Sequence, residues 1–160
     1  RPDLLTYFND WRTDMDLREF FDKKAVELSL KAETKDDVLR ELVSLLELEE
    51  KNESTLIKML KRRENLGSTG IGKGTAIPHC RSLVVSKLRV AYGRKPGGIA
   101  YNAIDNLPVE NFFLIVAPPL EVSNQYLPVL GKLAQFAKEP TNLAALKQVQ
   151  SPDELIKLLG

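Results

Sequence analysis

The chain has few of the residues that disulfides, metal sites and membrane spans require. It contains one histidine, His79, and one cysteine, Cys80. One cysteine permits no internal disulfide, and one His with one Cys cannot supply the usual ligand sets of zinc, so no metal site is expected. No secretory signal pattern is present, and no apolar stretch is long enough to cross a bilayer. These absences predict a cytoplasmic protein whose chain does not insert into a membrane.

An excess of charge of one sign is also missing. The 23 Lys and Arg residues against 22 Asp and Glu residues leave a formal net charge of +1. Such a balance creates no field over the whole surface that would attract nucleic acid or an anionic membrane. No nucleic-acid partner is predicted, and any partner must be recognised locally.

What is present suits one globular domain. Of the 160 residues, 43% are hydrophobic and 28% are charged, which is enough to bury a core. Residues 1–16 mix aromatic residues with turn formers and show no sustained period, so we interpret them as a leader or linker that could carry a docking segment. Residues 17–160 form the predicted domain.

Hydrophobic periodicity over residues 17–160 indicates both strands and helices. Strands are predicted near 26–30, 75–79, 88–94 and 111–117, and helices near 34–46, 54–63, 124–138, 142–148 and 151–159. The segment 111–117 has an apolar run without polar interruption, so it is expected to be buried on both faces. Helices on both sides of such a strand predict an α/β fold, a single-domain three-layer α/β/α sandwich.

Three helices carry more detailed expectations. Thr34 and Asp37 resemble a capping box at the start of the first helix, and Ser151 with Glu154 forms such a pattern at the start of the last. The charged face of the first helix is expected to be solvated. The residues of that face are Lys35, Arg40, Glu41 and Glu47. In the helix near 124–138, Leu127 is expected to point inward with Leu130 and Leu133.

A glycine-rich run, GSTGIGKGTAIPH at 67–79, leads into His79. It matches the start of a P-loop, but Gly74 stands where the Ser or Thr that holds magnesium belongs, and the run follows a helix and enters a strand, which is the reverse of a nucleotide site. The glycine spacing and the order of elements also fail the dinucleotide-binding fingerprint. No nucleotide or other cofactor is therefore expected.

His79 has two readings, as a structural histidine or as a nucleophile. Pro78 removes a sheet donor and so favours a sheet edge or strand end, which would place the imidazole at a rim. A neutral imidazole reached through glycines, whose N–H groups can face an anion, suggests phosphate on nitrogen. Cys80 points to the other face of an extended segment and is expected to be a small packing residue.

The residues Arg63-Glu64, the run 67–79 and the segment AIDNLPV at 103–109 together carry a family resemblance. Over about residues 17–160 the chain resembles the IIA domains of the phosphoenolpyruvate-dependent sugar phosphotransferase system, of the fructose and mannitol type. The nitrogen-related IIA proteins are the branch it resembles most.

This resemblance implies a mixed sheet with helices on both faces and a phosphoryl group carried on Nε2 of His79. It also implies that Arg63 helps to neutralise the phosphate, for which a planar guanidinium is well suited. The other reading of Arg63 is a helix C-terminal charge. Thr69 could donate its hydroxyl to the phosphate, or it could be a plain turn hydroxyl.

The chain departs from the family at Tyr126, which takes the position of a second histidine. A tyrosine hydroxyl can exchange hydrogen bonds with phosphate or imidazole but cannot carry a positive charge. Three consequences stay open, namely slower or retuned transfer, a sensor role, or a role for Tyr126 as an aromatic lid.

Three functions follow from the resemblance. In the first, the chain is a phosphotransferase component of nitrogen-regulatory type, with a histidine phosphocarrier protein as donor and a regulatory target protein as partner. In the second, a fructose- or mannitol-class IIA passes phosphate to a IIB domain for sugar uptake. In the third, the chain is a non-phosphorylated regulatory module attached to a transporter.

Overall fold

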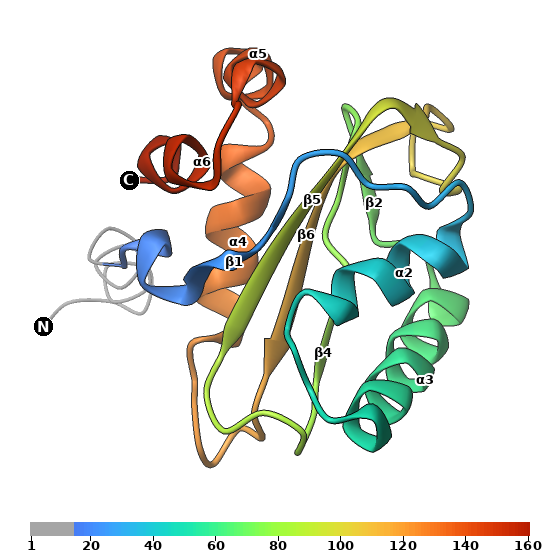
Figure 1. Cartoon of the computed structure of the whole chain (residues 1–160), viewed down its shortest axis with the longest axis vertical. Coiled ribbons are helices and arrows are strands. Elements are labelled where there is room, and N and C mark those ends of the chain that lie inside the picture. Colours follow the sequence, from blue (N-terminus) through green and yellow to red (C-terminus); the bar gives the residue numbers. More distant parts are fainter. Residues whose placement is uncertain (1–14) are drawn as a thin grey trace, which may run out of the picture.

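A computed structural model describes residues 15–160 (Figure 1). Most of the predicted leader lies outside the described residues. The elements in chain order are η1 (Leu17–Phe20), β1 (Phe21–Glu27), α2 (Lys35–Ser44), α3 (Glu50–Leu66), β2 (Gly70–Gly72), β3 (Thr75–Ala76), β4 (His79–Arg81), β5 (Arg89–Ile99), β6 (Val109–Ala117), α4 (Tyr126–Phe136), α5 (Pro140–Gln148) and α6 (Pro152–Leu158).

The strands form one mixed sheet in the order β1-β5-β6-β3-β2, with β4 also paired to β6. β5 and β6 are antiparallel, whereas β1 runs parallel to β5, and both β3 and β4 run parallel to β6. Every residue of β6 except Glu110 is buried, which confirms the expected burial on both faces.

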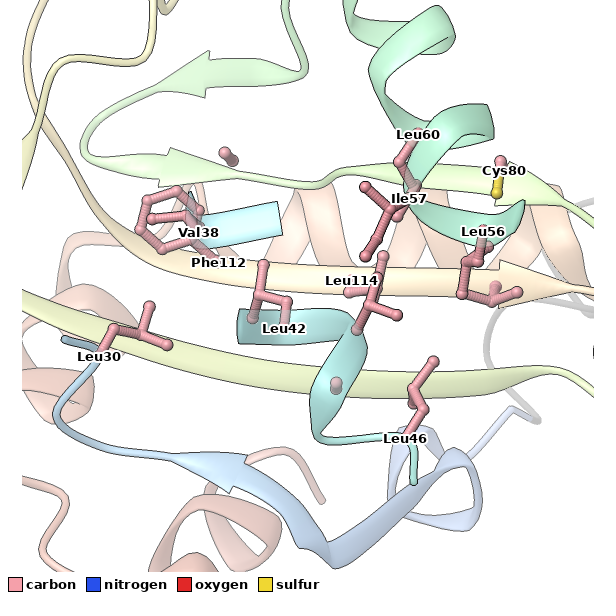
Figure 2. Packing of buried hydrophobic residues seen from close by; sticks show 14 of the residues in the cluster. Leu30, Val38, Leu42, Leu46, Leu56, Ile57, Leu60, Cys80, Phe112 and Leu114 are labelled. Atoms are coloured by element: carbon pink, nitrogen blue, oxygen red, sulfur yellow. The ribbon is translucent and has the colours of Figure 1, made fainter. Parts of the chain in front are cut away.

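Helices cover both faces of the sheet, as Figure 1 shows, and the predicted three-layer α/β/α sandwich is confirmed. Alternate residues of β6 enter two separate cores because successive side chains of a strand point to opposite faces. One core joins Phe112 and Leu114 to Leu42, Leu56 and Leu60 of α2 and α3 (Figure 2). The other joins Phe113 and Ile115 to Val129 and Leu133 of α4 and Leu155 of α6.

The first strand was misplaced by the sequence pattern. β1 ends at Glu27 and pairs with β5 through an irregular register, so residues 22–24 are exposed and no clean alternation marks the strand. The alternation that ends at Leu30 belongs mostly to the connection that follows. Leu30 is buried there, and its N–H donates to the carbonyl of Arg94 at 2.8 Å.

The other predicted element boundaries differ less from those in the structure. The predicted strand 75–79 is two short strands, β3 and β4, interrupted at Ile77 and Pro78. The second helix extends beyond 54–63 to cover Glu50–Leu66. The expectation for Leu127 was wrong, because this side chain is 64% exposed and the inward stripe of α4 runs through Val129 and Leu133.

Helix capping follows the sequence. The Thr34 hydroxyl accepts the N–H of Asp37 at 3.2 Å, and the Ser151 hydroxyl accepts the N–H of Glu154 at 3.2 Å. Each bond satisfies a backbone donor that the first turn of a helix leaves without a partner. Within residues 15–160, none of the helices combines the length and apolar character that crossing a bilayer requires.

Candidate functional site

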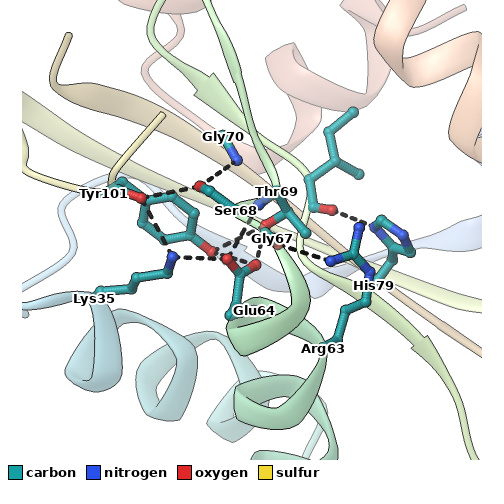
Figure 3. A network of polar contacts seen from close by, with 10 residues as sticks. Lys35, Arg63, Glu64, Gly67, Ser68, Thr69, Gly70, His79 and Tyr101 are labelled. Atoms are coloured by element: carbon teal, nitrogen blue, oxygen red, sulfur yellow. Dashed lines mark hydrogen bonds and ion pairs between the residues drawn. The ribbon is translucent and has the colours of Figure 1, made fainter. Parts of the chain in front are cut away.

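Three segments that are distant in sequence meet at one edge of the sheet, beside β4. The last turn of α3 supplies Arg63, the first residue of β4 is His79, and the first residue of α4 is Tyr126. Figure 3 shows the guanidinium of Arg63 beside the ring of His79. The rings of His79 and Tyr126 lie with their centroids 5.8 Å apart and their planes at 59°.

Pro78 explains the position of His79. It lies between β3 and β4, where it contributes no N–H to the sheet, while its carbonyl accepts the N–H of Ile115 at 2.9 Å. Among the described strands β4 pairs with β6 alone, and in this register His79 lies opposite Ile115. The imidazole is therefore half-buried at a sheet edge.

One hydrogen bond determines the tautomer of His79. Nδ1 lies 2.6 Å from the carbonyl oxygen of Ile77. Because a carbonyl oxygen only accepts, Nδ1 must carry the proton, and in the neutral ring the lone pair is then on Nε2. The backbone thus sets which ring nitrogen carries the proton and which carries the free lone pair.

The surroundings also keep the ring neutral. Burial lowers the pKa of His79 below its ordinary 6.5, and the positive charge of Arg63 lowers it further, while the Ile77 carbonyl and the Glu64 carboxylate oppose these effects. The folded ring therefore takes up a proton at a lower pH than a free histidine does. At neutral pH the lone pair on Nε2 is available.

Arg63 is held by the chain segment that follows its helix. Its Nη1 donates to the carbonyl of Gly67 at 2.8 Å, across the end of α3. The side chain is half-buried, whereas Arg62, the residue before it, is exposed. A guanidinium has five N–H donors, so the bond to Gly67 leaves others for an anion beside His79.

Tyr126 lies between His79 and a second arginine. The guanidinium carbon of Arg81 is 4.6 Å from the centroid of the Tyr126 ring, within the range of a cation–π contact. Arg81 Nη1 also donates to the carbonyl of Pro118 at 2.8 Å. Burial raises the pKa of Tyr126 to about 12, so its hydroxyl stays protonated.

Thr69 is placed differently from the other three predicted residues. It is 4% exposed, and its hydroxyl contacts the Glu64 carboxylate and, at 3.2 Å, the hydroxyl of Tyr101. These contacts engage the hydroxyl inside the fold, so the geometry favours the turn reading over a bond to phosphate.

The glycine-rich run forms a hairpin in place of an open anion loop. Gly70 is required because a Cβ there would lie 2.7 Å from the Cβ of Ala103, and Gly74 because its φ is +77°. The N–H groups of Thr69, Gly70 and Lys73 donate to the side chains of Glu64, Ser68 and Asp105, in that order. These three N–H groups are used internally, so the expected row of donors facing an anion is not found there.

Cys80 is a packing residue, as expected. It is 8% exposed and belongs to the core under α2 and α3. Burial raises the pKa of its thiol to about 12, so it is not a thiolate near neutral pH.

Sequence reasoning missed two features of the site. Arg81 could have been found, because it is two residues from His79 on a strand and so shares its face. Lys35 was expected to be solvated, yet its side chain is only 22% exposed and its Nζ lies 2.8 Å from a Glu64 oxygen. The hydrophobic periodicity of one helix shows which face is polar, but it does not show which of its charged residues pairs with another helix.

Fold and site together define an α/β domain that presents a neutral imidazole beside an arginine at the edge of a mixed sheet. The family model described as "Phosphoenolpyruvate-dependent sugar phosphotransferase system, EIIA 2" matches residues 19–160. The chain belongs to this family, and it is a phosphotransferase system component of the IIA type.

Relatives carry two kinds of name. The nitrogen regulatory protein of Bradyrhizobium diazoefficiens is 29% identical over 147 residues, which cover 91% of this chain and 95% of the relative. The fructose-specific EIIABC component of Bacillus subtilis is 29% identical over 148 residues, but the match spans only 23% of that protein. The crystal structure of the nitrogen regulatory protein IIA-Ntr from Neisseria meningitidis has a TM-score of 0.77 at 27% identity, covering 90% of this chain and 99% of that one.

The tautomer and the pKa of His79 are directly testable. We expect ¹⁵N NMR to show a neutral ring with the proton on Nδ1 at pH 7.5, and a titration midpoint below 6.5 because burial disfavours the imidazolium. The chain has one histidine, so the spectrum contains one imidazole. A ring protonated on Nε2, or a midpoint at or above 6.5, would contradict this description.

Proposed function

We propose that His79 accepts a phosphoryl group on Nε2 from a histidine phosphocarrier protein. The observation that carries this proposal is the bond from His79 Nδ1 to the Ile77 carbonyl at 2.6 Å, which leaves the lone pair on Nε2. The guanidinium of Arg63 beside the ring supports it (Figure 3).

In the proposed transfer one N–P bond forms while another breaks. The Nε2 lone pair attacks phosphorus, the donor's N–P bond breaks, and the electron pair returns to the donor imidazole. The His79 ring gains positive character as the new N–P bond forms, and the Ile77 carbonyl stabilises it by accepting a hydrogen bond from the Nδ1–H group. Charge on the equatorial oxygens of the loose transition state is met by Arg63.

We infer a regulatory role of the nitrogen-related type, with a target protein that responds to the phosphorylation state. This inference is supported by the match to a nitrogen regulatory protein over 91% of this chain and 95% of the relative. Because phosphoenolpyruvate is a cytoplasmic metabolite, we place the reaction in the cytoplasm.

The alternative is a fructose- or mannitol-class IIA that passes phosphate to a IIB domain. The Bacillus subtilis fructose-specific EIIABC relative favours it. Mixing the phosphorylated chain with a purified fructose IIB domain separates the two functions, since rapid loss of phosphate to IIB supports sugar uptake and retention supports regulation.

Labelling tests the phosphoacceptor. Incubation with phosphoenolpyruvate, enzyme I and a histidine phosphocarrier protein is expected to add one acid-labile phosphoryl group, measured by intact mass. His79→Ala should abolish the gain and keep the fold, because the ring is half-buried at a sheet edge. Absence of labelling in the wild type would favour the non-phosphorylated module. Equal labelling of the wild type and the variant would show that His79 is not the phosphoacceptor.

Arg63 and Arg62 form a matched pair for testing phosphate stabilisation. Arg63→Ala should slow single-turnover transfer by about 10²-fold, the scale of losing one preorganised donor of charge stabilisation. Arg62→Ala removes the same charge from an exposed neighbour and should change the rate by less than about 2-fold. Equal effects of the two substitutions would show that Arg63 acts only as a charge at the end of its helix.

The role of Tyr126 depends on whether its ring or its hydroxyl acts. Packing between His79 and Arg81 favours the ring, so Tyr126→Phe should keep the transfer rate and Tyr126→Ala should slow it by about 10-fold through misplacement of the imidazole. Tyr126→His should preserve or raise the rate. A loss of about 2- to 12-fold in Phe, equal to one hydrogen bond of about 0.5–1.5 kcal/mol, would assign the role to the hydroxyl.

A further inference from the structure

Glu64 is a buried carboxylate with a complete set of partners (Figure 3). Its side chain is 5% exposed, and its Oε2 lies 2.8 Å from Lys35 Nζ and accepts the N–H of Thr69 at 3.1 Å. Its Oε1 accepts the Tyr101 hydroxyl at 3.1 Å and contacts the hydroxyl of Thr69. A buried charge is retained only when it is paired and hydrogen-bonded, as this one is.

Lys35 is fixed as firmly as its partner. Besides the Glu64 carboxylate, its Nζ contacts the carbonyl of Tyr101 at 3.3 Å and lies 4.3 Å from the centroid of the Tyr101 ring. The ion pair therefore joins α2 to the last turn of α3 at a defined position.

From Glu64 a path of hydrogen bonds leads to the imidazole. The carboxylate accepts the N–H of Thr69, the Thr69 carbonyl accepts the N–H of Ile77 at 3.0 Å, and the Ile77 carbonyl accepts the Nδ1–H of His79. Thr69 and Ile77 each make one hydrogen bond toward Glu64 and one toward His79. The buried carboxylate therefore positions the carbonyl that selects the tautomer of His79.

The same helix turn holds the segment a second time. Arg63 donates to the carbonyl of Gly67, and the next residue, Glu64, binds Thr69. Two consecutive side chains of α3 thus fix the segment 67–69, and the position of Arg63 relative to His79 depends on both.

We propose that Lys35 and Glu64 are positioning residues for phosphoryl transfer. Their ion pair anchors Thr69, and through Ile77 it holds the proton of His79 on Nδ1 and directs Nε2 toward the phosphoryl donor. The proposal rests on the proposed function of His79 for its effect on rate, but its effect on the tautomer is independent of that function.

Glu64→Gln tests the proposal with little change in shape. We expect ¹⁵N NMR of the unphosphorylated variant to show a mixture of Nδ1–H and Nε2–H forms of His79. We also expect phosphoryl transfer to slow by about 10- to 100-fold, by analogy with removal of the partner that orients a metal-binding histidine. A purely structural role would lower the unfolding midpoint and leave the tautomer and the rate unchanged.

The chain offers a matched control. Lys61 and Asp36 also link α3 to α2, at 3.5 Å, but their side chains are 31% and 66% exposed. Asp36→Asn removes one charge of this pair and should alter neither the tautomer nor the rate. If Asp36→Asn and Glu64→Gln change both measurements equally, the effect comes from the helix contact and the proposal is overturned.

A second variant covers the case in which Glu64→Gln does not fold. The double variant Lys35→Met and Glu64→Leu removes both charges, so neither is left buried alone, and such replacements are often well tolerated. It should show the same mixed tautomer and slower transfer. A wild-type imidazole spectrum in a folded variant overturns the proposal.

If the wild type takes up no phosphate, only the proposed function fails. The ¹⁵N spectrum of the unphosphorylated variants then still shows whether Lys35 and Glu64 determine the tautomer of His79.

Discussion

The fold depends on the burial of β6 on both faces. A strand that is apolar on both sides must be covered by helices on both sides, and α2 and α3 take one face while α4 and α6 take the other. β5, β3 and β4 all pair with this strand. Its pairing with β4 places His79 opposite Ile115 and so sets the imidazole at the edge of a rigid sheet.

The site arises where the ends of three elements converge around that edge. The end of α3 brings a cation, β4 brings a neutral imidazole, and the start of α4 brings an aromatic ring. The site consists of side chains at the ends of these three elements. A backbone carbonyl determines which nitrogen of the imidazole is protonated.

The glycine-rich run serves this arrangement structurally. Three of its N–H groups donate to side chains of the protein, and close packing against Ala103 requires a glycine at position 70. The run therefore works as a rigid hairpin that connects the end of α3 to β4. The positive charge beside His79 comes from a side chain, that of Arg63.

The sequence by itself was sufficient for the layers, the buried strand, the helix caps, the packing role of Cys80 and the family. These features follow from local periodicity, from side chains a few residues apart, or from a contiguous motif. It also identified His79 as the residue to examine, because no other imidazole exists in the chain.

Tertiary structure alone decided the first strand, the exposure of Leu127 and the partners of Thr69 and Lys35. An irregular edge strand lacks the alternation that marks a strand, and a short helix does not reveal which of its leucines meets the sheet. The tautomer of His79 and the ion pair of Lys35 with Glu64 join positions that only folding brings together. Hydrogen bonds and ion pairs act over about 3 Å in space, and no spacing along the chain encodes such a distance between separate elements.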